Sequence, residues 1–262
     1  MTNLSVKYFS TKETLDQIKE WIASERSGIY MRLGDGDINL ALSKNELYQQ
    51  ANPTLSQLMK DAIQLEEDGI FKALPLHCSD LGTLEEGMFP GNHECQPDWC
   101  ENITNSFQQI SGKSGEIILY SAVALSHQAV VDPEYAIEFL KFLGSKVKYF
   151  IGNENIPRDL LEKIFNKDVV HIPTPSSNSF SKFDRIYSNF INSVGVDEEY
   201  SVVITSMGCS GRPMQKRIYD NYKNFFLFDF GSLMDALCGD ATRAWIELTN
   251  FDKDGFLDRL VV

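Results

Sequence analysis

The sequence contains no apolar stretch approaching the roughly 20 residues that a membrane-spanning helix needs. Its opening residues, Met1 to Ser5, lack the basic and then apolar build of a signal peptide. Basic residues are also scarce: 24 lysines and arginines stand against 37 acidic residues, which gives a formal net charge of −13. Because a nucleic-acid-binding protein normally presents a basic face, this balance argues against nucleic acid as a partner.

Cysteine is scarce as well, with five residues at irregular spacings. An odd and irregular set disfavours a disulfide framework and favours a reduced, cytoplasmic compartment. The segment from 77 to 100 contains two histidines and three cysteines, but their order does not follow the Cys-x2–4-Cys pairing of structural zinc sites. Zinc is therefore not expected there.

The composition is ordinary for a globular protein of 262 residues, with 43% hydrophobic and 23% charged residues. Helical and strand patterns alternate, and between residues 81 and 100 the pattern becomes irregular. This alternation predicts a single Rossmann-like α/β domain over residues 1–262, with a mainly parallel sheet and flanking helices. The expected strands cover residues 28–33, 70–76, 116–120, 146–151, 169–172, 201–206 and 225–230, and the expected helices 10–23, 52–65, 101–110, 133–143, 157–165, 180–194 and 212–222.

The most informative motif follows the first of these strands. Arg32 is followed by Gly34, Asp35, Gly36 and Asp37. Two carboxylates on a turn that leaves a strand can direct hard oxygen ligands at one divalent cation, and the glycines allow a ligand to approach the backbone closely. The guanidinium of Arg32 suits a phosphate. Together they predict a metal–diphosphate site, with Mn²⁺ or Mg²⁺ as the cation.

Two other readings of the same acids stay open. Aspartates in such a turn also cap the following helix. Aspartyl-phosphate phosphatases carry Asp-x-Asp after a strand as well, but Asn39 stands where they have threonine or valine, and the chain contains no Asp-Asp pair.

A second candidate lies after the strand expected at 201–206, where Gly208, Ser210, Gly211 and Arg212 open a helix. Backbone amides, small residues and a basic side chain in this place can cradle an anion. An ordinary strand-to-helix turn is an equal alternative. The Gly-Lys-Ser/Thr ending of a Walker loop is absent.

Two further strand ends carry polar side chains. Asn178 lies in a Ser/Asn-rich turn that could bind a ribose, base or sugar, or could simply cap the next helix. Asp229, Ser232 and Asp235 follow the last strand, where a carboxylate could act as a general base. Because ligands of such sheets bind outside the carboxyl ends of the strands, these turns are expected to converge.

With these residues the chain resembles the GT-D-type glycosyltransferases, bacterial enzymes with an Arg-x-Gly-Asp-Gly-Glu stretch. Residues 32–37 are similar to it, with Asp37 in place of the glutamate. Residues 175–180 resemble the family's Asn-Ala-Phe/Tyr segment, 208–212 its small-residue turn and 229–231 its Asp-Ile-Gly. Many members continue that last motif with histidine, where this chain has Ser232. The resemblance spans about residues 25 to 245.

The resemblance implies a UDP-sugar donor such as UDP-glucose, Mn²⁺ or Mg²⁺, and transfer of the sugar to a glycan or glycoconjugate. A cation on Asp35 and Asp37 would stabilise the departing diphosphate, which gives Asp37 a catalytic role, and Asp235 would deprotonate the acceptor hydroxyl. A phosphatase or phosphoryl-transfer enzyme, or a nucleotide-sugar-binding module without turnover, remains an alternative. The residues expected to contact the donor are Arg32, Gly34, Gly36, Asn178, Gly208, Ser210, Gly211, Arg212, Asp229 and Ser232.

Overall fold

The computed structural model describes residues 5–47, 49–75, 97–113, 115–196 and 198–260. Its strands form one eight-stranded sheet in the order β1-β4-β3-β2-β8-β7-β5-β6, and all neighbouring strands run parallel. The predicted α/β fold with a parallel sheet and flanking helices is therefore confirmed. The strands are β1 (Ser5–Tyr8), β2 (Gly28–Arg32), β3 (Ile70–Leu74), β4 (Glu116–Ser121), β5 (Val147–Asn153), β6 (Val170–Thr174), β7 (Ser201–Ser206) and β8 (Phe225–Asp229).

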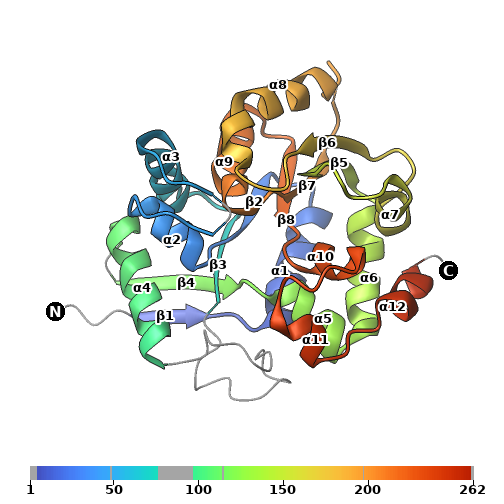
Figure 1. Ribbon diagram of the computed structural model, residues 1–262, viewed down its shortest axis with the longest axis horizontal. Coiled ribbons are helices and arrows are strands. Elements are labelled where there is room, and N and C mark those ends of the chain that lie inside the picture. Colours follow the sequence, from blue (N-terminus) through green and yellow to red (C-terminus); the bar gives the residue numbers. More distant parts are fainter. Residues whose placement is uncertain (1–4, 48, 76–96, 114, 197, 261–262) are drawn as a thin grey trace.

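Helices cover both faces of this sheet (Figure 1). The residues before α1 and α3 show why these helices begin where they do. Ser10 and Glu13 exchange the two hydrogen bonds of a capping box, and Asn52 accepts the Leu55 amide before a first-turn proline. The helices are α1 (Thr11–Ala23), α2 (Asp35–Ala41), α3 (Pro53–Gln64), α4 (Pro97–Ser111), α5 (Ala124–Val131), α6 (Pro133–Gly144), α7 (Arg158–Ile164), α8 (Phe183–Ser193), α9 (Gly211–Asn221), α10 (Leu233–Cys238), α11 (Ala244–Leu248) and α12 (Lys253–Leu260), and the 3₁₀ turns are η4 (Ser179–Lys182) and η5 (Gly208–Ser210).

β4 agrees with the strand expected at 116–120, and its Ile118 is 48% exposed because inward side chains alternate with outward ones beside the edge strand β1. Two other expectations need correction or fall outside the described part. Residues 97–100, expected to be irregular, begin α4. The rest of the irregular segment, residues 81–96, and the histidines and cysteines at 77, 78, 93 and 95 lie outside the described residues.

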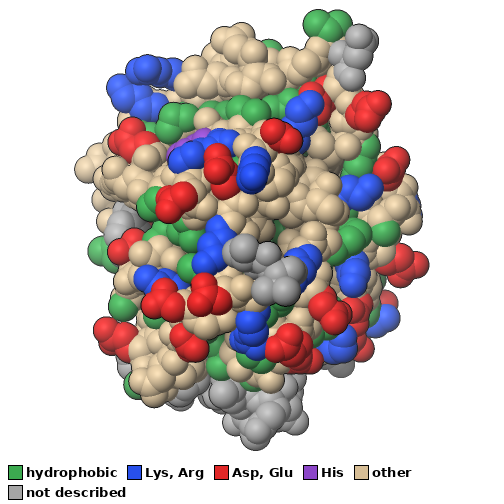
Figure 2. All heavy atoms as spheres, turned by 90° about the vertical axis from the view of Figure 1, so that its right-hand side faces the viewer, with side chains coloured by type: hydrophobic (Ala, Val, Ile, Leu, Met, Phe, Trp, Pro, Cys, Tyr) green, Lys and Arg blue, Asp and Glu red, His purple; other side chains and the backbone are tan. Residues whose placement is uncertain are grey.

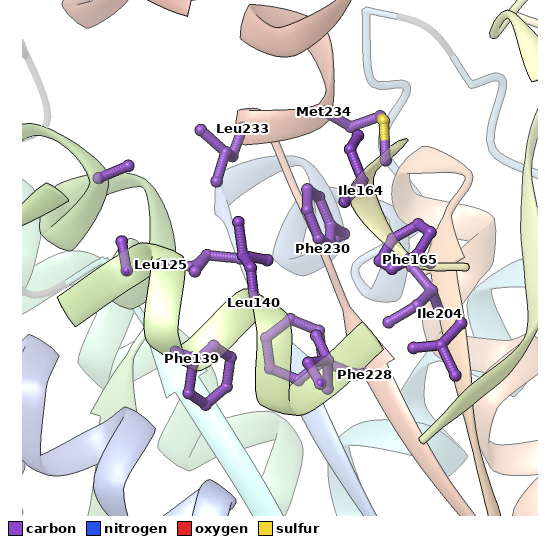
Figure 3. Close-up of a cluster of buried hydrophobic side chains, with 14 of the residues drawn as sticks. Leu125, Phe139, Leu140, Ile164, Phe165, Ile204, Phe228, Phe230, Leu233 and Met234 are labelled. Carbon is purple, nitrogen blue, oxygen red and sulfur yellow. The ribbon is translucent and has the colours of Figure 1, made fainter. Parts of the chain in front are cut away.

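The last strand, β8, shows how the two hydrophobic cores orient the site. Phe226 and Phe228 pack into the core under α1, α5, α6, α10 and α12, and Leu227 packs into the core under α3, α8 and α9. Because side chains alternate along a strand, Asp229 points to the same side as Leu227, toward α9. Figure 3 shows Phe228 and Phe230 packed among side chains of α6, α7 and α10, which fixes the end of the strand.

The centre of the sheet is also where its connections diverge. The chain leaving β2 passes into α2 and α3 on one face, and the chain leaving β8 passes into α10 on the opposite face. In parallel sheets, ligands bind beside such a divergence, outside the carboxyl ends of the strands. The ends of β2 and β8 are therefore the expected position of a site.

Two surface findings complete the description. Within the described residues no helix has both the length and the apolar character to cross a bilayer. On the face seen at the right of Figure 1, acidic and basic side chains are interspersed (Figure 2).

Candidate functional site

The two acids after β2 occupy the first turn of α2, not an open turn. Asp37, 2% exposed, accepts the Gly34 amide through Oδ2 at 2.8 Å, so it caps the helix as the alternative reading held. Asp35 is exposed and accepts the Gly36 amide at 2.8 Å. One carboxylate thus faces the interior and the other faces solvent.

Asp37 belongs to a buried group of four charges that we call the charge cluster: Arg32, Asp37, Arg212 and Asp229. Arg212 lies between the two acids, with Nε 3.3 Å from Asp37 Oδ1 and Nη1 2.6 Å from Asp229 Oδ2. Arg32 Nη1 lies 3.5 Å from the other oxygen of Asp229. The four residues come from β2, α2, α9 and β8. The turns that follow these strands therefore bring these four side chains together, as expected.

Burial dominates the electrostatics of the cluster. It raises the pKa of Asp37, and the charge of Arg212 and the Gly34 amide only partly oppose this. Burial alone would lower the pKa of Arg212, but Asp229 and Asp37 outweigh it and raise that pKa. Asp37 Oδ1 and Asp229 Oδ2 are buried and face Arg212 as ion pairs without an aligned hydrogen bond. The two arginines balance the charge of the two acids. Because Arg212 contacts both acids, its charge compensates the burial of both carboxylates.

Arg32 is held in place by its neighbours. Its Nε donates to the Ala122 carbonyl oxygen. Gly231, the second residue after β8, packs directly on the guanidinium: a Cβ there would lie 1.3 Å from Arg32 Nη1, and the backbone has φ of +67°. Both the contact and the backbone angle require glycine at 231.

The 208–212 turn is a 3₁₀ turn that leads into α9. Arg212 Nη1 donates to the Gly208 carbonyl at 2.9 Å, which orients the guanidinium toward the cluster. A Cβ at Gly208 would meet nothing within 4 Å, so this residue faces open space, although its φ of +59° favours glycine. Gly211 and Gly34 have φ outside the left-handed region and no close neighbour. Gly36 differs, because a Cβ there would lie 2.6 Å from Glu46 Cγ.

A buried glutamine that the sequence analysis missed joins the remaining candidates. Gln49 Oε1 accepts from the Ser210 hydroxyl and the Phe180 amide, both at 3.2 Å. Its Nε2 donates to Asn178 Oδ1 at 2.7 Å. Ser210 also shares a hydrogen bond of 2.9 Å with Ser179. Asn178 and Ser210 therefore brace the turns around the cluster. No pattern in the sequence marks a single glutamine in a loop for this role.

Asp235 and Ser232 lie at the start of α10, which packs on the opposite face of the sheet from α9. Thr242 donates to Asp235 Oδ2 at 2.6 Å, and Trp245 Nε1 donates to the Ser232 hydroxyl at 3.3 Å. Burial raises the pKa of Asp235, while the Thr242 hydrogen bond and the charges of Arg243 and Arg32 oppose the rise. Asp235 thus faces the field of Arg32 without touching the charge cluster.

The placement of Asp35 and Asp37 does not fit a cation shared by both. Asp37 is engaged by Gly34 and Arg212, and Asp35 faces solvent. Among the residues that the structure describes, no three or more His, Cys, Asp or Glu side chains are grouped to hold a metal ion. Dependence on Mn²⁺ or Mg²⁺ therefore stays a prediction, and no step below passes through a metal.

Comparison with known proteins finds matches at the level of structure. No protein-family profile and no curated protein sequence matches the chain. A solved structure described as a new glycosyltransferase (domain of unknown function 1792) from Streptococcus sanguinis is similar with a TM-score of 0.66 and 17% identity, over 92% of this chain and 88% of that one. A second, described as having a distinct glycosyltransferase fold, gives 0.65 and 16% over 90% and 83%.

A third structure, of the same domain of unknown function 1792 with selenomethionine, gives a TM-score of 0.65 and 16% identity over 88% of this chain and 79% of that one. The chain thus has the glycosyltransferase fold of this domain, as the sequence resemblance implied. At this level of identity the likeness concerns the fold.

Proposed function

We propose that the protein is a glycosyltransferase that moves a sugar from a nucleotide-sugar donor, a UDP-sugar such as UDP-glucose, to a hydroxyl of a glycan or glycoconjugate. The observation that carries the proposal is the charge cluster at the ends of β2 and β8, in a fold shared with a described glycosyltransferase. Two guanidinium groups beside the carboxyl ends of central parallel strands suit a diphosphate.

The chemistry requires a bond at the sugar to break and another to form. The bond from the anomeric carbon to the diphosphate oxygen breaks, and its electron pair leaves with the nucleoside diphosphate. The acceptor oxygen bonds to the anomeric carbon and gives up its proton. A site for this reaction must stabilise the growing negative charge and provide a base.

Arg32 is the cluster residue best placed to meet the diphosphate. Its side chain is 19% exposed, compared with 11% for Arg212. A guanidinium has five N–H donors, and the contacts to Ala122 and Asp229 leave others for a phosphate. Arg212 supports it by holding Asp229 and Asp37, and its positive charge adds to that of Arg32.

Asp235 is the proposed base that takes the acceptor proton. Burial raises its pKa, which makes the carboxylate a stronger base than a solvated aspartate. The Thr242 hydroxyl holds one carboxylate oxygen in place and leaves the other to face the substrate.

Assays of UDP-glucose with and without Mn²⁺ test the proposal. Release of UDP supports sugar transfer or donor hydrolysis by this site. Release of inorganic phosphate would identify a phosphatase instead, and binding without either product would identify a binding module; each of these outcomes overturns the proposal.

The cation is tested separately with Asp35→Asn. Asp35 is exposed and, within the described residues, accepts a hydrogen bond from the adjacent Gly36 amide alone, so the free energy of unfolding should stay within about 0.5 kcal/mol of the parent. If Asp35 ligates a cation, Mn²⁺-dependent UDP binding, measured by calorimetry, should fall at least ~10-fold. Undiminished activity in EDTA would rule out the predicted metal dependence.

Replacing Asp235 with asparagine should lower kcat by about 10²–10⁴-fold, because the proton acceptor is lost, while UDP-glucose binding is retained. Since the base acts when ionised, the activity of the parent should fall as the pH drops through the raised pKa of Asp235. Thr242→Val removes a hydrogen bond that lowers this pKa, so the acid limb of the kcat/KM profile should move to higher pH. An unmoved limb would contradict the role of Asp235.

A further inference from the structure

A groove of about 670 Å³ lies between α3, the η4–α8 segment and α9, outside the charge cluster. Figure 1 shows these three helices close together on one side of the sheet. The volume lies within the range of small-molecule sites. None of the residues assigned above to the donor or the base lines it.

The charged side chains along the groove differ in whether they have ion-pair partners. Of its three acids, Asp184 pairs with Arg217 and Asp220 with Lys216, each at 2.6 Å, and Asp61 accepts a hydrogen bond from Gln57 Nε2 at 2.8 Å. Lys182 and Arg185 also line the groove and are exposed, and neither forms an ion pair with any residue that the structure describes. The lining carries four cations and three acids, and in a protein of net charge −13 this local positive excess favours an anionic ligand.

The groove also has an apolar part. Phe180 and Phe183 have ring centroids 5.2 Å apart, and Leu58 and Pro213 line the groove with them. An aromatic surface beside cations suits an amphipathic molecule that has C–H faces and a charged group, and a sugar that carries phosphate or carboxylate has both.

The groove adjoins the candidate site through two direct links. The Phe180 amide donates to Gln49 Oε1 at 3.2 Å, and this same oxygen accepts from Ser210. Pro213 follows Arg212 of the charge cluster. A ligand in the groove is therefore separated from the cluster by the Gln49 side chain and the first turn of α9.

We propose that this groove binds a sugar that carries an anionic group, phosphate or carboxylate, held by Lys182 and Arg185. Binding of such a sugar rests on the cavity and its charges and is independent of the proposed function.

Titration of the labelled protein with glucose 1-phosphate, glucuronate or neutral glucose, followed by amide NMR shifts, tests the site. Both anionic sugars should move the amides of residues 180–185 and 214–217, and glucose should bind at least 5-fold more weakly. The two anions distinguish phosphate from carboxylate as the preferred group. Shifts confined to residues around Arg212 and Gly231 and abolished by UDP would place the anion in the donor site and overturn the proposal.

The double variant Lys182→Gln/Arg185→Gln should weaken binding of the anionic sugars at least 10-fold. The matched control Lys19→Gln/Lys167→Gln loses the same charge outside the groove and should bind like the parent. Hydrolysis of UDP-glucose should be unchanged in both variants. Equal weakening in both would show that the effect is one of net charge and would contradict a specific site.

The two proposals fail in distinguishable ways. UDP-glucose hydrolysis without shifts in the groove overturns the anion site alone. Groove binding of anionic sugars without any binding of UDP-glucose overturns the donor assignment and leaves the anion site standing.

Discussion

Replacing Arg212 with glutamine should lower the free energy of unfolding by about 3–5 kcal/mol, because two buried carboxylates lose the charge that compensates them. For a chain of this size the melting temperature should fall by roughly 6–20 °C. Donor binding should be lost at the same time, since Asp37 and Asp229 would then repel a diphosphate. Thermal and urea unfolding, together with calorimetry of UDP binding, measure both effects.

The pH dependence identifies the cause of this loss. Arg212 is the main influence that lowers the pKa of Asp37, so the variant raises that pKa further. A folded state that binds a proton more tightly than the unfolded state gains stability as the pH falls. The deficit of Arg212→Gln should therefore shrink below neutral pH. A deficit independent of pH would instead point to lost packing.

Lys163→Gln is the control for removing a cation. Lys163 pairs with Asp258 at the surface, where the side chains are 31% and 80% exposed. Such pairs contribute about 0–1 kcal/mol. An equal loss of unfolding free energy in Lys163→Gln and Arg212→Gln would contradict the role of Arg212 in compensating buried carboxylates.

Gly231→Ala should lower donor affinity at least ~10-fold, because the new methyl group must displace the Arg32 guanidinium. The backbone at φ of +67° adds a strain of about 1–2 kcal/mol. Gly112→Ala separates the two effects, since Gly112 has a similar φ of +71° and no atom within 4 Å of the added Cβ. Gly112→Ala should be destabilised with donor binding intact. Intact donor binding in Gly231→Ala as well would show that Arg32 does not contact the diphosphate.

Much of the fold was predictable because the buried strands and amphipathic helices of a parallel α/β sheet produce regular patterns in the sequence. Strands such as β7 are short apolar runs between helical periods, and the caps at Ser10 and Asn52 mark helix starts by local chemistry. The elements that escaped prediction are β1, α2, α5, α10, α11 and α12. β1 is a four-residue edge strand, and α5 is a short helix without a polar face, which gives no helical periodicity.

The site was predictable in part for the same reason. Arg32 and Asp229 end β2 and β8, Arg212 lies in the first turn of the helix that follows β7, and parallel topology brings these strand ends together. The separation of Asp35 and Asp37 was not visible, because the motif opens a helix, where residues two apart point to different sides. The Gln49 network depends on tertiary packing of a loop against two distant turns, which no local pattern encodes.

The position of β2 has a consequence for how the chain is made. Gly28 on β2 pairs with Phe226 on β8, so the strand that leads into the site stays open on one edge until the last strand has emerged from the ribosome. A fragment that ends before β8 would present this apolar edge to other chains, and we expect it to aggregate.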